Sequence, residues 1–163
     1  MKKYCAVLVM LLLLTGCGSR ETFETIGDDY VQSAATAGME ILLNIPQEAA
    51  TPSLKNENAE KIYLCDGYTL TVQTLEAGDL DATIRAVSGY GRDSLVVMET
   101  EQGDFTRYDF VWSSAGEGGD QVGRAAVLDD GSYHYAVACM APEESSGALR
   151  EAWDAIFDSF WLG

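Results

Sequence analysis

A two-residue turn pattern, Asp66-Gly67, lies between two runs of alternating apolar residues and constrains the fold of this chain more than any other feature. Asp-Gly favours a type I′ turn, in which both central residues take positive φ, and such a turn joins two antiparallel strands. Pairing outward from the turn sets Cys65 opposite Tyr68 and Tyr63 opposite Leu70. The sequence therefore predicts a hairpin with one buried face, made of Tyr63, Cys65, Tyr68, Leu70 and Val72.

A short helix and four more strands are expected after this hairpin. Leu80, Ile84 and Val87 recur at helical spacing behind Asp79, which suits an N-cap, so a helix should run to near Gly89. Apolar runs separated by glycine-containing turns then predict four strands, Leu95–Thr100, Phe105–Trp112, Gln121–Leu128 and Tyr133–Met140. Because such turns connect neighbours, these strands should form an antiparallel meander. A further strand is expected at Met39–Ile45, ahead of Pro46.

The last hairpin is expected to be central in the sheet because both of its faces are apolar. A turn at Asp130-Gly131 would pair Leu128 with Tyr133 and Ala126 with Tyr135, which gives one bulky face. The opposite face is small, and consists of Ala125, Val127, Ala136, Ala138 and Met140. A terminal helix is predicted by an apolar stripe of Leu149, Trp153, Ile156, Phe157 and Phe160. We expect this helix to approach the small face.

The predicted fold class is α+β, with an antiparallel sheet of about six to seven strands packed by the C-terminal helix and the short internal helix. The ending Trp153…Ile156-Phe157-Asp158-Ser159-Phe160, placed after a Tyr-rich strand, resembles the C-terminal helix of small lipoproteins with a PsbP-like or DcrB-like fold. The order of elements is also similar over residues 39–163. The resemblance implies a sandwich used as a binding or accessory module, and it transfers no catalytic residue.

The N-terminus has the three parts of an export signal. Lys2 and Lys3 precede the uncharged run Ala6 to Leu14, which is too short to span a membrane, and small residues then lead to Cys17. The motif Leu14-Thr15-Gly16-Cys17 resembles the lipobox of bacterial lipoproteins, which implies cleavage before Cys17 and attachment of lipid to its thiol. An ordinary secretory signal that happens to contain a cysteine is the alternative.

This resemblance sets the expected domain plan and location. Residues 1–16 would be the signal peptide, residues 17–38 the lipidated cysteine and a flexible spacer, and residues 39–163 a single globular domain. Two or three acyl chains on Cys17 are enough for stable attachment. The mature protein is therefore expected to be lipid-anchored on the extracytoplasmic face of the cell membrane.

The charge of the chain restricts its partners. The net charge is −16, and loss of the signal peptide with its two lysines makes it −18. Such a polyanion repels nucleic acid, so the expected partners are the membrane through the anchor at Cys17 and an envelope protein, a peptide or a small ligand. Solubility at a crowded surface is the other explanation of the charge.

Two cysteines remain for the folded domain once Cys5 leaves with the signal peptide and Cys17 is lipidated. Cys65 and Cys139 are candidates for a disulfide because exported proteins often carry one. Two buried thiols are the alternative. The sequence leaves both open.

The sequence predicts no catalytic residue, metal site or cofactor. His134 is the only histidine, is expected opposite Val127 on the small face, and has no nucleophile-elbow motif to accompany it. The acidic pairs Asp129-Asp130 and Glu117 with Asp120 are better explained as hairpin turns than as calcium ligands.

Aromatic residues are the remaining candidates for a binding surface. The aromatic positions Tyr108, Phe110 and Trp112 alternate along one strand face, and Tyr133 and Tyr135 share another. Core packing and a ligand cavity both explain them. Trp161, beyond the stripe of the terminal helix, is expected to be partly exposed.

Two hypotheses for function follow. The first is a non-enzymatic binding or accessory module of the cell envelope, and the alternative is an envelope hydrolase that uses His134 with an unrecognised nucleophile. The environment of His134 separates the two. A position on the floor of a cleft within reach of Ser, Cys or Asp would favour the hydrolase, whereas packing under apolar side chains would oppose it.

Overall fold

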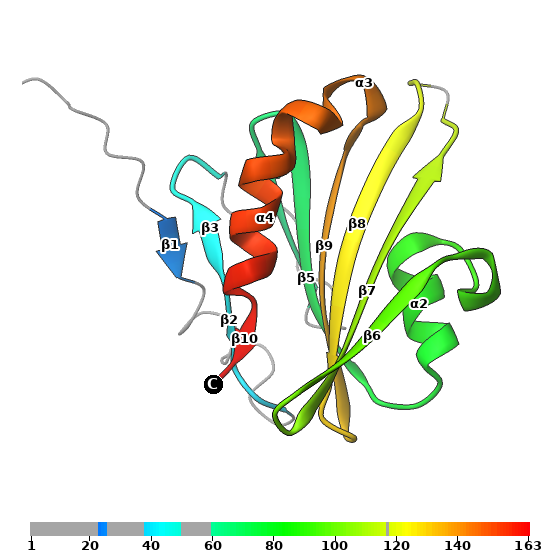
Figure 1. The fold of residues 1–163 in the computed structure, drawn as a ribbon. Coiled ribbons are helices and arrows are strands. Elements are labelled where there is room, and N and C mark those ends of the chain that lie inside the picture. The colour runs from blue at the N-terminus through cyan, green and yellow to red at the C-terminus, as the bar shows by residue number, and fades with distance from the viewer. Residues whose placement is uncertain (1–22, 26–37, 50–59, 117) are drawn as a thin grey trace, which may run out of the picture.

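A six-stranded antiparallel sheet forms the centre of the molecule, with the strand order β4-β5-β9-β8-β7-β6 (Figure 1). The computed structural model describes residues 23–25, 38–49, 60–116 and 118–163. The strands of this sheet are β4 (Lys61–Cys65), β5 (Tyr68–Glu76), β6 (Val97–Gln102), β7 (Phe105–Ser114), β8 (Gln121–Asp129) and β9 (Tyr133–Pro142). The sheet and its helices confirm the predicted α+β class, and β6 to β9 confirm the predicted meander.

The first hairpin has the predicted register. Cys65 pairs with Tyr68 and Tyr63 pairs with Leu70, across a turn in which Gly67 has a φ of 79°. The buried apolar residues form two cores, one on each side of the sheet. Tyr63, Tyr68 and Leu70 are buried in the larger one, as the alternation predicted. A positive φ of this kind is costly for residues with a Cβ, so the glycine fixes where the turn forms.

The last hairpin differs from its predicted register by two residues. Leu128 pairs with Tyr135 rather than with Tyr133, because the turn is centred on Gly131-Ser132. The carboxylate of Asp130 causes this shift, since its Oδ1 accepts the backbone N–H groups of Ser132 and Tyr133, both at 2.7 Å. A shift of two residues leaves every side chain on its predicted face.

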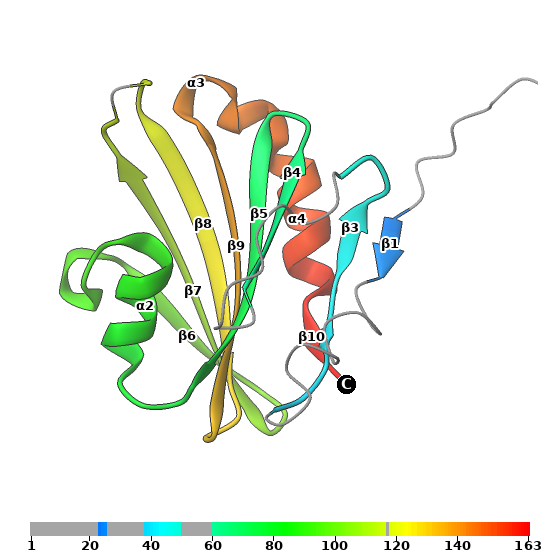
Figure 2. The same cartoon turned by 180° about the vertical axis from the view of Figure 1, so that it is seen from behind.

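The sheet has one bulky face and one small face, and each is covered by a different helix. The bulky face carries Leu70, Leu128, Tyr135, Val137 and Cys139, and it packs against α4 (Arg150–Ser159). The small face carries Ala125, Val127, Ala136 and Ala138, and it packs against α2 (Leu80–Ser88), which Figure 2 shows lying across it.

The expectation that the terminal helix covers the small face is therefore wrong. The stripe itself is correct, since Trp153, Ile156 and Phe157 are buried on α4 and Phe160 is buried just beyond it. The chain leaves β9 through α3 (Glu143–Ser146) and the 3-10 turn η2 (Gly147–Leu149), which return it over the bulky face (Figure 1). Large side chains on both partners bury more apolar area there than the alanine face could offer.

Two arginines from the sheet hold α4 in place. The guanidinium of Arg107 pairs with Asp109 at 2.8 Å and donates to the carbonyl oxygen of Phe157 at the end of the helix. The guanidinium of Arg124 lies 4.4 Å from the centre of the Phe157 ring. The helix is thus fixed both by apolar burial and by charged side chains at its edge.

The internal helix has the predicted ends. The Asp79 carboxylate accepts the N–H of Asp81 at 3.0 Å, and Gly89 ends the helix with a φ of 81°. The strand after it starts at Val97 rather than at Leu95, because the 3-10 turn η1 (Arg92–Ser94) intervenes and the N–H of Leu95 donates to Arg92.

Short strands outside the central sheet lie beside α4 over the bulky face (Figure 1). The predicted strand Met39–Ile45 is split into β2 (Ile41–Leu42) and β3 (Asn44–Pro46). These strands pair outside the central sheet, β2 with β10 (Trp161–Leu162) and β3 with β1 (Phe23–Thr25). Ile41, Leu43 and Ile45 are buried, so the predicted apolar run does belong to the core.

Candidate functional site

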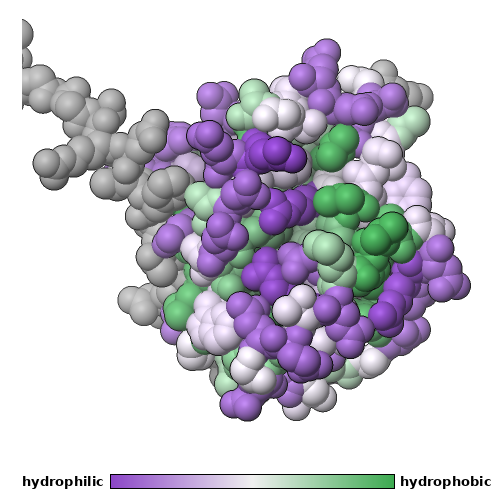
Figure 3. Space-filling model, in the orientation of Figure 1, coloured by the Kyte–Doolittle hydropathy of each residue, from purple (hydrophilic) through white to green (hydrophobic). Residues whose placement is uncertain are grey.

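The outer part of the bulky face is not covered by the described residues, and the three most exposed large apolar side chains among them lie there. The exposed fractions of Val96, Met98 and Val111 are 82%, 63% and 58%. Figure 3 shows this apolar area as a patch beside α4, bordered by hydrophilic side chains. Together with Val122 on β8, these residues are called the open strip below.

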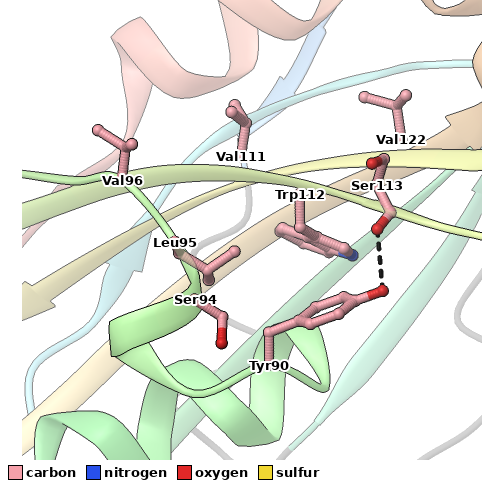
Figure 4. Close-up of a pocket in the computed structure, with 8 residues that line it drawn as sticks. All are labelled: Tyr90, Ser94, Leu95, Val96, Val111, Trp112, Ser113 and Val122. Atoms are coloured by element: carbon pink, nitrogen blue, oxygen red, sulfur yellow. Dashed lines mark hydrogen bonds between the residues drawn. The ribbon is translucent and has the colours of Figure 1, made fainter.

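Strand register explains why these side chains lie together. Val111 of β7 pairs with Arg124 of β8, so Val122 lies diagonally beside Val111 on the same face. Val96 directly precedes β6 and continues its register opposite Val111. Figure 4 shows Val96, Val111 and Val122 projecting from one side of the strands and Trp112 from the other.

A groove of about 690 Å³ separates the open strip from the helices. Its floor contains Val111 and Val122, and its walls contain Arg124, Trp153 and Asp154, together with Ser146, Gly147 and Arg150. The Arg124 guanidinium donates to Asp154 at 2.6 Å, which neutralises both charges. Arg150 makes no ion pair within the described part of the chain. The groove therefore combines an apolar floor with a net positive wall.

Trp153 is a buried aromatic residue of that wall. Its ring packs edge-on against Tyr68, with 6.3 Å between the ring centres. The indole Nε1 is buried and has no hydrogen-bond partner among the described residues. A buried donor without an acceptor costs free energy, and this one has almost no accessible surface from which a ligand in the groove could reach it.

A second pocket, of about 490 Å³, continues from the strip around the edge of β7 (Figure 4). β6 starts at Val97 opposite Phe110, so within the described residues the end of β7 lacks a strand neighbour on this side. The hydroxyl of Tyr90 donates to the carbonyl oxygen of Ser113 at 2.9 Å and covers part of that edge.

The wall of this second pocket depends on a glycine. A Cβ on Gly123 would overlap the ring of Trp112. The indole therefore lies directly over the backbone of β8. Phe110 and Trp112 are buried in the smaller core, so core packing accounts for the alternating aromatics of β7.

His134 is buried in the small face and is 2% exposed. Its Nδ1 lies 2.6 Å from the hydroxyl oxygen of Thr83 on α2, and its Nε2 lies 3.5 Å from a carboxylate oxygen of Asp129. It pairs with Asp129 rather than with Val127, as the corrected register requires. A hydroxyl, an imidazole and a carboxylate are the groups that nucleophilic catalysis uses.

Thr83 and His134 are both buried. Thr83 is only 5% exposed, and neither pocket described above is lined by Thr83 or His134. A substrate would have to displace α2 to reach the hydroxyl. The contact instead ties the helix to β9, because each buried polar atom supplies the hydrogen-bond partner of the other.

The two cysteines of the domain are free thiols. Both point to the bulky face, but β5 lies between the strands that carry Cys65 and Cys139. Strands two apart are separated by roughly 9 to 10 Å, whereas a disulfide needs a Cα separation below about 7 Å. The candidate bridge is therefore not formed. Burial raises the pKa of both thiols, which favours their protonated form.

Two further residues lie where the sequence predicted. Asp130 belongs to the hairpin turn. Trp161 is 37% exposed and packs edge-on against Phe105. Cys17 and Glu117 lie outside the described residues. Within the part of the chain that the structure describes, no group of His, Cys, Asp or Glu side chains could hold a metal ion, and no helix is long and apolar enough to cross a bilayer.

Sequence reasoning missed the open strip and its groove. The pattern was present, since Val96 and Met98 alternate with Leu95 and Val97 and thus place apolar side chains on both faces of an edge strand. Two-sided apolarity is typical of central strands. In an edge strand it indicates a face that the rest of the described chain does not cover.

The chain matches no protein-family model and no curated protein. Among solved structures it is similar to the cyanobacterial PsbP protein CyanoP from Synechocystis sp. PCC 6803, with a TM-score of 0.59 and 11% identity over 92% of this chain and 99% of that chain. It is also similar to LpqN, which is involved in cell envelope biogenesis of Mycobacterium tuberculosis, with a TM-score of 0.51 and 13% identity over 88% and 90% of the two chains.

A third similar structure comes from Bacteroides thetaiotaomicron, with a TM-score of 0.51 and 10% identity. This chain covers 45% of that protein, and the similarity extends over 76% of this chain. At such identities the likeness establishes the fold alone. The fold is PsbP-like, as the ending of the sequence implied.

Proposed function

We propose that this protein is a lipid-anchored accessory module of the bacterial cell envelope, which binds a ligand or partner through its open strip and catalyses no reaction. The observation that carries the binding role is the uncovered outer part of the bulky face. Monomeric soluble proteins rarely leave such contiguous apolar area exposed, and polar borders around it are typical of binding sites.

The location rests on the N-terminal motif and is supported by one structural neighbour. Leu14-Thr15-Gly16-Cys17 provides the cleavage and lipidation pattern. LpqN, with the same fold, is involved in cell envelope biogenesis. An anchor at Cys17 would hold the domain on the extracytoplasmic face, where an exposed groove can meet envelope components.

Palmitate labelling of cells tests the anchor. Cys17→Ala should abolish labelling and release the protein from membranes, because the thiol that accepts the lipid is gone. Cys5→Ala is the matched control, since Cys5 lies in the expected signal peptide, and it should leave labelling and fractionation unchanged. Persistent labelling of the Cys17→Ala protein would contradict the proposed anchor.

The hydrolase alternative predicts a reactive nucleophile. Thr83 is the hydroxyl in contact with His134, so a hydrolase built on this pair should react with a fluorophosphonate probe at that residue. We expect the folded protein to form no adduct, because α2 and the sheet enclose both side chains. An adduct mapped to Thr83 by mass spectrometry would establish the alternative instead.

A further inference from the structure

The groove beside the open strip has one cationic donor that is not paired with a carboxylate among the described residues. Arg150 lines the groove, and its guanidinium takes part in none of the ion pairs within the described residues. The only carboxylate of the lining, Asp154, already accepts from Arg124 at 2.6 Å. A ligand that completes this site must therefore supply an acceptor, and an anionic one suits the guanidinium best.

This positive wall is unusual in a chain of net charge −16. The arginines Arg85, Arg92, Arg107 and Arg124 are each paired with a carboxylate within 4 Å. Arg150 is exposed at the start of α4 and is not paired in this way. The groove thus offers a free cation next to exposed apolar side chains, while acidic residues dominate the rest of the surface.

The apolar part of the site is long and narrow. The open strip runs from Val122 on β8, across β7, to Met98 on β6, and so crosses two strand spacings. Val122 pairs with Ser113 of β7 and Met98 pairs with Asp109 of β7, so the strip also moves four residues along β7. That path measures roughly 17 Å from the standard spacing and rise of strands. An extended hydrocarbon chain such as that of dodecanoate has a comparable length.

We propose that the groove binds a free fatty acid, with its carboxylate at Arg150 and its alkyl chain along the open strip from Val122 to Met98. Neutralisation of Arg124 by Asp154 leaves a single cation, which matches one carboxylate. The narrow strip suits one alkyl chain. This inference deepens the proposed binding role and rests on it, but it does not depend on the lipid anchor.

Direct titration tests the proposal. The protein carrying Cys17→Ala, purified without detergent, is titrated with dodecanoate below its micelle concentration and followed by calorimetry. We expect saturable binding with a one-to-one ratio. Dodecylammonium, with the same chain and the opposite charge, should bind far more weakly, because the guanidinium would repel it.

Paired variants locate the site. Arg150→Gln should weaken dodecanoate binding about tenfold, which is the effect of losing one charge-assisted hydrogen bond. Arg85→Gln on α2 removes an exposed arginine elsewhere and should leave the affinity unchanged. Val111→Ser should weaken binding, whereas Leu64→Ser, at an exposed apolar position on the opposite face of the sheet, should not.

The outcomes are decisive in either direction. Absence of saturable binding, equal affinity for dodecylammonium, or affinity that ignores both Arg150→Gln and Val111→Ser would overturn the proposal and leave the strip for a protein partner. Unchanged circular dichroism of the variants would show that they remain folded. None of these results affects palmitate labelling at Cys17, so failure here is distinguishable from failure of the proposed anchor.

Discussion

The two faces of the central sheet are covered in different ways. The bulky face packs against α4 and the short strands β2, β3 and β10, and its core is mainly aromatic and aliphatic, with Lys61 as a buried charged residue on the edge strand β4. The small face packs against α2 and the segment that follows it, and its buried residues include His134, Thr83 and Gln73. One face is thus held by apolar volume, and the other by a short helix with a polar contact.

This difference shows how a sheet with two buried faces distributes its helices. The aromatic side chains of α4 pack against large buried side chains of the sheet, such as Leu128 and Tyr135. On the other face the sheet presents alanines, so α2 fills the space above them with smaller side chains such as Ile84. Because α4 is narrow, it leaves the outer strands of the bulky face open. The candidate site is therefore a direct consequence of unequal cover.

The largest effect is expected on the bulky face. Trp153→Ala should lower the free energy of unfolding by about 3–5 kcal/mol, because a buried ring is lost and its cavity remains. Urea denaturation measures the change. Trp161→Ala is the matched control, and it should cost much less because that ring is partly exposed. Equal losses for the two tryptophans would mean that α4 does not anchor the larger core.

Much of this fold is determined locally and could be predicted from the sequence. Asp66-Gly67 determined the register of the first hairpin because a two-residue turn leaves no freedom in pairing. Asp79 and Gly89 determined the ends of α2 for a similar reason, since capping involves only neighbouring residues. The stripe that includes Trp153 correctly identified which side of the terminal helix is buried.

What could not be predicted depends on contacts between distant segments. An apolar stripe shows that a helix has a buried side but not which sheet face receives it, so α4 was expected on the wrong face. The turn at Gly131-Ser132 was missed because Asp130 uses its side chain to extend the loop. The groove was missed because the sequence of one strand does not show which helices and strands pack over it.

A smaller effect is expected where the small face is held by its polar contact. Thr83→Val keeps the shape of the side chain but removes the hydroxyl, which leaves Nδ1 of His134 buried without its partner. The expected loss is about 1–3 kcal/mol. Thr100→Val, at an exposed position of β6, controls for the substitution itself. A loss no greater than that of the control would show that α2 is held by apolar contacts alone.

A still smaller change in the free energy of unfolding, and one that depends on pH, is expected for Asp130 at the rim of the bulky face. Burial alone would raise the pKa of Asp130, but the N–H groups of Tyr133 and Ser132 and the hydroxyl of Tyr135 outweigh it and hold this pKa below its ordinary value. The same Tyr135 hydroxyl accepts the N–H of Met39 at 2.7 Å, so this contact joins the hairpin to the short strands.

Because the folded pKa is depressed, the stabilisation by Asp130 is present above the unfolded pKa of about 4 and is lost as the pH falls through the folded value. Asp130→Asn should therefore cost about 1 kcal/mol at neutral pH and nearly nothing in strong acid. Denaturation curves at several pH values measure this difference. Asp104→Asn, in the exposed β6–β7 turn, is the control, and a loss that is the same at every pH would rule out the carboxylate as its source.

The smallest expected effect concerns the two thiols of the bulky face. Reductant should leave the unfolding midpoint unchanged, because Cys65 and Cys139 are separated by β5 and are not bridged. A bridge between them would close a long loop and contribute roughly 4.5 kcal/mol. Thiol labelling of the denatured, unreduced protein should modify both residues. If reductant instead lowered the midpoint, β4 and β9 would have to lie closer than their shared neighbour allows, and the register of the bulky face would need revision.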